Sequence, residues 1–123
     1  MRFDRRRASH ERRQSDRIPA VFAVKKAVAG NDGTPSPHIQ LCQAEDIAPA
    51  GITIKRPRGS AVLARTEVAL SFALPGSRDE ISARGVVVSD SSAGAFRRTG
   101  VRFIALAPAH AQLIAGYCRR GGR

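Results

Sequence analysis

Two short segments of the sequence contain side chains that could recognise a charged ligand. The first holds Arg12, Arg13 and Arg17, and the last two have the spacing Arg-x-x-x-Arg. The second runs from Asp46 to Gly51 in the frame Asp-x-Ala-x-x-Gly. Guanidinium groups suit phosphates and the acceptor edge of guanine, whereas a carboxylate accepts from the donor edge. Together the segments predict a binding site for a guanine nucleotide that carries phosphates, and not a site that breaks bonds.

Length and composition indicate one folded domain with a basic surface. A chain of 123 residues, 42% of them hydrophobic, supports one modest core, which must be mainly aliphatic because aromatic residues make up only 5%. The formal net charge of +11 exceeds what solubility requires and predicts an anionic partner. Nonspecific attraction to nucleic acid explains the same charge, so composition leaves both interpretations open.

Residues 1–17 are predicted to form a separate, flexible basic arm. They contain seven arginines and three acidic residues, a net charge of +4, with one Phe and almost nothing else apolar. Such a segment cannot bury enough surface to order itself. We therefore expect the folded domain to cover residues 18–120. A ligand with two phosphates would neutralise several guanidinium groups, so the arm is expected to fold onto the domain on binding.

The folded domain is predicted to be all-β. Alternating or β-branched runs predict strands over residues 18–28, 38–46, 51–55, 67–74, 81–88 and 97–104. Turn-forming residues separate these runs, including a serine- and glycine-rich segment from Asp90 to Gly94 that is expected to be a loop. Six or seven short strands with no helices between them favour an antiparallel sheet closed into a small barrel.

A single helix is expected to follow the strands. Pro108 is compatible with a first helical position, and Leu113, Ile114 and Tyr117 then fall on one helix face. Gly121 is expected to end the helix. The predicted arrangement is an amphipathic helix that lies against one mouth of the barrel.

Targeting signals and a disulfide framework are not expected. No apolar region follows the basic N-terminus, and no apolar run approaches the about 20 residues that a membrane-spanning helix needs. Cys42 and Cys118 are too few for a disulfide framework and make a poor metal site. These observations predict a cytoplasmic protein without a membrane span, a metal or a cofactor.

Catalysis is the least supported function. Glu45 and Asp46 could form a carboxylate pair, but adjacent residues of a strand are expected to point to opposite faces. The three histidines have no metal-ligand spacing, and no glycine-rich phosphate loop with a lysine is present.

The order of these features resembles the PilZ domain family. A basic arm, Arg-x-x-x-Arg, a strand, a long loop, Asp-x-Ala-x-x-Gly, further strands and a terminal helix follow one another as in that family. Residues 74–76, 85–88 and 99–103 also resemble its later segments, so that the resemblance covers roughly residues 11–118. It implies a six-stranded antiparallel barrel that binds the bacterial second messenger cyclic di-GMP.

The resemblance also implies roles for individual residues. Arg13 and Arg17 would contact the phosphates and guanine edges of the ligand, with Arg12 beside them on a base or a phosphate. Asp46 would accept from guanine N1–H and its exocyclic amine. The small residues Ala48 and Gly51 would allow close backbone contact.

Two departures from the family pattern bear on affinity. The family often has Ser where this chain has Ala48, a loss of at most one hydrogen bond, on the order of 1 kcal/mol. Val88 and Ser89 occupy positions where some relatives have an aromatic residue that stacks on a base.

Lys55, on the expected solvent face four residues beyond Gly51, is a further candidate phosphate contact.

Two alternatives to a receptor stay open at this stage. A PilZ domain can serve as a ligand-independent adaptor, and the basic arm could bind polyanions without specificity, although the arm lacks interleaved aromatic residues. A receptor of this kind is expected to act on an unidentified downstream protein.

Overall fold

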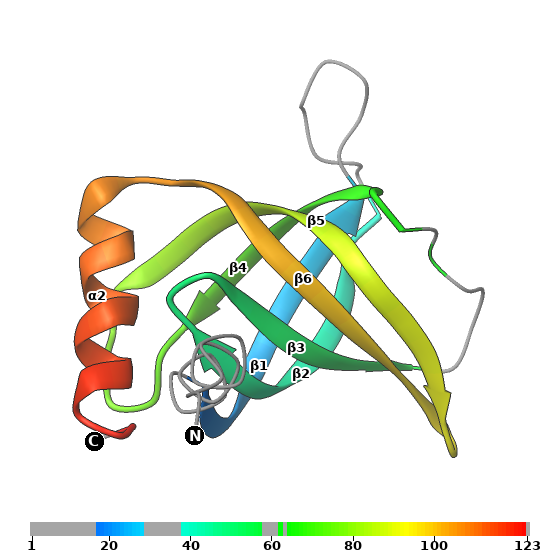
Figure 1. Cartoon of the computed structure of the whole chain (residues 1–123), viewed down its shortest axis with the longest axis horizontal. Coiled ribbons are helices and arrows are strands. Elements are labelled where there is room, and N and C mark those ends of the chain that lie inside the picture. The colour runs from blue at the N-terminus through cyan, green and yellow to red at the C-terminus, as the bar shows by residue number, and fades with distance from the viewer. Residues whose placement is uncertain (1–16, 29–37, 58–61, 63, 123) are drawn as a thin grey trace, which may run out of the picture.

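A computed structural model describes residues 17–28, 38–57, 62 and 64–122 of the chain (Figure 1). The predicted arm therefore lies outside the described residues, apart from Arg17. The elements are β1 (Ile18–Val28), β2 (Gln40–Ala48), β3 (Gly51–Pro57), β4 (Glu67–Ala73), β5 (Glu80–Ala93), β6 (Phe96–Leu106) and α2 (Pro108–Arg119).

The six strands form one closed antiparallel barrel. The order around the barrel is β1-β2-β3-β6-β5-β4, so that β1 pairs with both β2 and β4. Alternation along the strands directs apolar side chains inward, as on β4, where Val68, Leu70 and Phe72 are buried. Closure makes the outward faces of the six strands one continuous surface, and the predicted fold class is confirmed.

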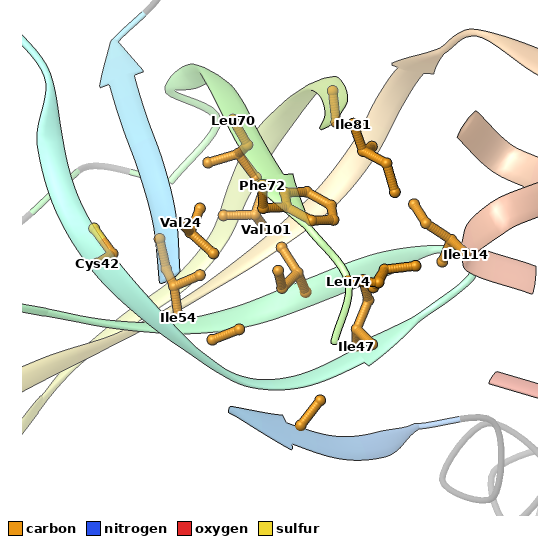
Figure 2. Packing of buried hydrophobic residues seen from close by; sticks show 14 of the residues in the cluster. Val24, Cys42, Ile47, Ile54, Leu70, Phe72, Leu74, Ile81, Val101 and Ile114 are labelled. Atoms are coloured by element: carbon orange, nitrogen blue, oxygen red, sulfur yellow. The ribbon is translucent and has the colours of Figure 1, made fainter. Parts of the chain in front are cut away.

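Helix α2 covers one end of this barrel. Its Ile114 is fully buried and points toward Ile81, Leu74 and Ile47, whereas Cys42 lies on the other side of the same apolar cluster (Figure 2). Pro108 occupies the first turn of the helix, and Gly121 follows its end with a positive φ of 67°. The helix therefore supplies the apolar closure of one barrel mouth, as predicted.

The expected loop from Asp90 to Gly94 is wrong. Strand β5 continues through Asp90 to Ala93, and β6 begins at Phe96, so that Gly94 with its φ of 66° lies in a short hairpin turn. The serine-rich composition of this segment resembles that of a loop because its outward positions are exposed. Strands β5 and β6 continue together there, beyond the strands that flank them (Figure 1). The Asp90 side chain is nevertheless buried, at 4% exposure.

Candidate functional site

A row of residues crosses four strands on the outer face of the barrel. Asp46 on β2 pairs with Thr53 on β3, which pairs with Gly100 on β6, which in turn pairs with Ser89 on β5. Thr53 and Gly100 each adjoin residues that point into the core, such as Ile54. The row therefore faces outward and brings together segments that are far apart in the sequence.

A β-bulge in β2 changes the expected direction of two carboxylates. The register shifts between Ala44 and Asp46, and both Ala44 and Ile47 are fully buried, so the two residues between them face outward. The expectation that Glu45 and Asp46 point to opposite faces is therefore wrong. Their partners differ: Glu45 accepts hydrogen bonds from Arg98, whereas Asp46 lies beside Arg17.

Arg17 extends across the start of this row. Its Nη1 lies 3.7 Å from Asp46 Oδ1, and it donates a hydrogen bond of 3.4 Å to Thr53 Oγ1. The Arg17 side chain is 61% exposed and that of Asp46 is 27% exposed. A guanidinium and a carboxylate so loosely paired can both turn toward an incoming ligand, because little free energy holds an exposed ion pair together.

The hairpin between β2 and β3 forms one wall of the site. Ala48 and Gly51 are paired across its turn, and the Ala50 carbonyl accepts a hydrogen bond of 2.9 Å from the Phe103 amide. A Cβ at Gly51 would lie 2.4 Å from the Val101 carbonyl oxygen. The glycine is thus required by the close approach of β6, which holds the hairpin against the sheet.

The hairpin, Arg17 and the row enclose a pocket of about 470 Å³. Arg17, residues 48–53, Val88, Ser89 and residues 100–102 line it. Of the predicted site residues, Arg17, Ala48 and Gly51 are in this lining, and Asp46 contacts Arg17 at its edge. Two guanidinium groups, Arg17 and Arg102, and one carboxylate can therefore meet a single ligand.

Lys55 lies outside this lining, in the next row along the strands. Its ammonium is 3.9 Å from Glu45 and 5.2 Å from the centre of the Phe96 ring. Arg98 donates hydrogen bonds of 2.6 and 3.0 Å to the same carboxylate and so lowers the pKa of Glu45, with Lys55 adding to the decrease. The structure places Lys55 in this ion cluster and not in the pocket.

Three of the pocket residues that sequence reasoning did not assign to the site are Thr53, Gly100 and Arg102. Arg102 is exposed on β6, opposite Gly51, and alternation over residues 97–104 already places it on the outer face. No sequence pattern pointed to Thr53 or Gly100, since only the strand register shows that they lie in one row with Asp46. Arg12 and Arg13 lie outside the described residues, so their positions stay predictions.

A metal site and a membrane-spanning helix are absent from the residues that the structure describes. Within them, no three His, Cys, Asp or Glu side chains are grouped so that they could hold a metal ion. Helix α2 is too short and too polar to cross a membrane, and the described part of the chain contains no helix that could.

Solved structures with a similar fold include the following three. The Bacillus subtilis inhibitor of motility MotI/DgrA has a TM-score of 0.72 at 18% identity. The match covers 85% of this chain and 48% of that protein, so this chain spans about half its length. The PilZ domain of YcgR from Escherichia coli, solved with c-di-GMP, has a TM-score of 0.64 at 13% identity and coverages of 87% and 91%.

The third similar structure is the PilZ domain of CeSA from a cellulose-synthesizing bacterium. Its TM-score is 0.58 at 20% identity, over 81% of this chain and 95% of that domain. The search of curated proteins gave no match. The family model of the PilZ domain matches residues 11–120, which include the basic motif, the barrel and α2. The chain belongs to the PilZ domain family.

Proposed function

We propose that this chain is a non-catalytic receptor for cyclic di-GMP. The observation that carries the proposal is the meeting of Arg17, Asp46 and the Ala48–Gly51 hairpin at one pocket on the barrel. PilZ domains are typically cyclic di-GMP receptors or adaptors, and the similar YcgR domain was solved with this ligand. The pocket supplies groups that match both parts of the ligand, its phosphates and its guanine edges.

Each proposed contact follows from the chemistry of the side chain. Asp46 accepts from guanine N1–H and the exocyclic amine, and Arg17 donates to a phosphate or to a guanine acceptor. Ala48 and Gly51 let the ligand approach the hairpin backbone. Lys55 acts on the phosphates from the neighbouring row, where it is 35% exposed.

Arg12 and Arg13 are proposed to complete the site from the N-terminal side. Arg13 precedes Arg17 by four residues, a distance of at most about 14 Å along an extended chain. Since Arg17 already reaches Asp46, the preceding arginines are within reach of a ligand in the pocket. Binding would fix the arm over residues 1–17 against the barrel, and this altered surface would be recognised by a downstream protein.

Calorimetric titration with cyclic di-GMP tests the proposal. The wild type should bind saturably with a Kd near 1 µM, which corresponds to about −8 kcal/mol. Arg17→Ala should bind at least about tenfold more weakly, because a charge-assisted hydrogen bond contributes about 1.5–3 kcal/mol. Lys25→Ala removes the same charge from the exposed outer side of β1 and should stay within about twofold of wild type, because solvent screens distant charges.

Two results would contradict the receptor function. The absence of saturable heat with wild type would leave a ligand-independent PilZ adaptor. Equal displacement of the dinucleotide by an oligothymidine of the same phosphate content would indicate a polyanion binder, since thymine lacks the donor edge that Asp46 is proposed to recognise.

A further inference from the structure

A buried carboxylate on β5 collects hydrogen bonds from three segments of the chain. Asp90 accepts from Thr99 Oγ1 at 2.6 Å, from Arg97 Nε at 2.9 Å, from Arg56 Nη2 at 3.0 and 3.1 Å and from the Val62 amide at 3.1 Å. Burial alone would raise the pKa of Asp90, but these donors outweigh it and hold the pKa well below its usual range. The carboxylate is therefore ionised, and both of its oxygens accept hydrogen bonds.

This Asp90 cluster lies directly behind one wall of the candidate pocket. Asp90 pairs with Thr99 across β5 and β6, and the next pair along the ladder is Ser89 with Gly100. Asp90 and Thr99 point inward, whereas Ser89 and Gly100 line the pocket. A Cβ at Gly100 would lie 2.5 Å from Ser89 Oγ, so the serine side chain leans over the glycine. A shift of either inner residue would move this outer pair.

The backbone ladder holds the Gly100 half of this wall on both sides, from β3 and β5, but it holds the Ser89 half weakly. The register of β5 shifts between Val87 and Ser89, which places Val88 in a bulge. On its other side β5 pairs with β4 only as far as Val86, and the last backbone hydrogen bonds there join Val87 to Arg65 and Thr66. Within the described residues, β5 beyond this point has a strand neighbour on one side, and the Asp90 side chain adds bonds to Arg56 on β3, beyond β6, and to the Val62 amide.

We propose that Asp90 is a positioning residue that fixes the Ser89–Gly100 wall through Thr99, Arg56 and Arg97 and thereby sets ligand affinity. This inference rests on the proposed function, since cyclic di-GMP is the ligand whose affinity is concerned. Asp90 itself is 4% exposed and does not line the pocket, so it acts through the backbone of its neighbours.

Charge and positioning make opposite predictions for Asp90→Asn. Two guanidinium groups face this one carboxylate, and removing its charge makes the region behind the pocket more positive. If charge alone mattered, an anionic dinucleotide would bind more tightly to the variant. If Asp90 positions the wall, binding becomes weaker despite the added positive charge. We expect the Kd for cyclic di-GMP to rise about tenfold, the effect of a modest displacement of contacting groups.

Thr99→Val repeats the test without a change of charge. The substitution keeps the shape of the side chain but removes both the hydrogen bond to Asp90 and the acceptor of the 2.9 Å bond from Arg56 Nε. We expect a Kd about three- to tenfold higher than wild type, because one partner of a buried pair is left unsatisfied. Thr99→Val also serves where Asp90→Asn does not fold.

Two matched controls separate positioning from other effects. Glu67→Gln also removes one carboxylate paired with an arginine across two strands, but Glu67 lies on β4 and its partner Arg84 is outside the pocket lining. Ile114→Ala destabilises the barrel from the α2 end. Both should bind with the Kd of wild type, measured well below their unfolding temperatures.

The inference is overturned if folded Asp90→Asn and Thr99→Val bind within twofold of wild type, if Asp90→Asn binds more tightly, or if Ile114→Ala weakens binding equally. A wild type that does not bind would instead refute the proposed function. In that case, amide hydrogen exchange at Ser89 and Gly100 still tests the wall. Exchange of these two amides should be faster in Thr99→Val than in Ile114→Ala, which destabilises the barrel from its other end. Equal exchange in the two variants would overturn the positioning role.

Discussion

Two adjacent carboxylates on β2 have different partners, and the partners decide what each can bind. Glu45 forms a close ion pair with Arg98 and a second ion pair with Lys55, whereas the ion pair that Asp46 forms with Arg17 is loose, at 3.7 Å. Asp46→Asn and Glu45→Gln each remove one negative charge from the same surface. We expect Asp46→Asn to weaken cyclic di-GMP binding at least tenfold, because an amide cannot accept both guanine donors, and Glu45→Gln to change the Kd less than about threefold. Calorimetry on the pair checks this; equal losses would exclude a guanine contact by Asp46.

Lys26 is a second residue whose surroundings determine its behaviour. It is 6% exposed at the barrel end away from α2, and burial lowers its pKa; Arg56 adds to the decrease, while Cys42 and Asp90 oppose it. The unfolded chain therefore binds a proton more tightly than the native state, and stability rises as pH increases toward the ordinary lysine pKa. Lys26→Met should raise the free energy of unfolding at pH 7 by about 1 kcal/mol.

This gain should shrink as pH rises, because Lys26 of the native wild type then loses its proton and with it the cost of a buried charge. Urea unfolding of the two proteins at pH 7 and pH 9.5 measures the difference directly. A gain that is equal at both pH values, or a loss of stability at pH 7, would contradict the assigned effect of burial.

At the scale of elements, the β2–β3 hairpin depends on one glycine. In Gly51→Ala the new methyl group would lie 2.4 Å from the Val101 carbonyl oxygen. Gly51 and Val101 both belong to paired strands, so neither can move away easily. We expect a loss of about 2 kcal/mol in the free energy of unfolding, because overpacking forces the strands apart. Gly116→Ala is the control: its nearest neighbours are the flexible ends of Arg120 and Arg119, and within helix α2 it should stabilise by about 0.5–1 kcal/mol. Denaturant unfolding of both variants checks the opposite signs.

Element types were largely predictable, whereas bulges and pairing were not. The run at 18–28 coincides with β1 because it is long and rich in apolar and β-branched residues, and a cluster of turn-forming residues follows it in the sequence. The buried carboxylate of Asp90 was unpredictable, because a serine-rich strand that extends past its neighbours has the composition of a loop. The bulge at Glu45 was also missed, since an inserted residue reverses alternation without any signature in its own side chain.

The candidate site was predictable to the extent that a motif carried it. Asp46, Ala48 and Gly51 lie within one hairpin, and their spacing alone brings them together. Thr53, Gly100 and Arg102 could not be assigned in the same way, because their proximity to Asp46 depends on which strands are neighbours in the closed barrel. The order in which β6 follows β3 is a property of the complete fold.

For the whole molecule, the net charge of +11 and the local pocket make separable contributions to binding. Attraction to the overall charge is screened by salt and grows with the number of phosphates that are neutralised. The free energy that Asp46 contributes by contacting guanine edges does not depend on the number of phosphates neutralised. A ligand with two phosphates should therefore respond weakly to salt, and a long polyanion strongly.

We expect a rise from about 50 to about 200 mM salt to weaken cyclic di-GMP binding less than about tenfold, and to weaken binding of a 20-nucleotide oligothymidine by about a hundredfold or more. Titrations of both ligands at several salt concentrations measure the two slopes. Parallel slopes would mean that the basic surface alone attracts the dinucleotide. A shallow slope for the dinucleotide, together with the loss of binding in Asp46→Asn, would assign recognition to the outer-face pocket, because the total charge does not distinguish guanine from thymine.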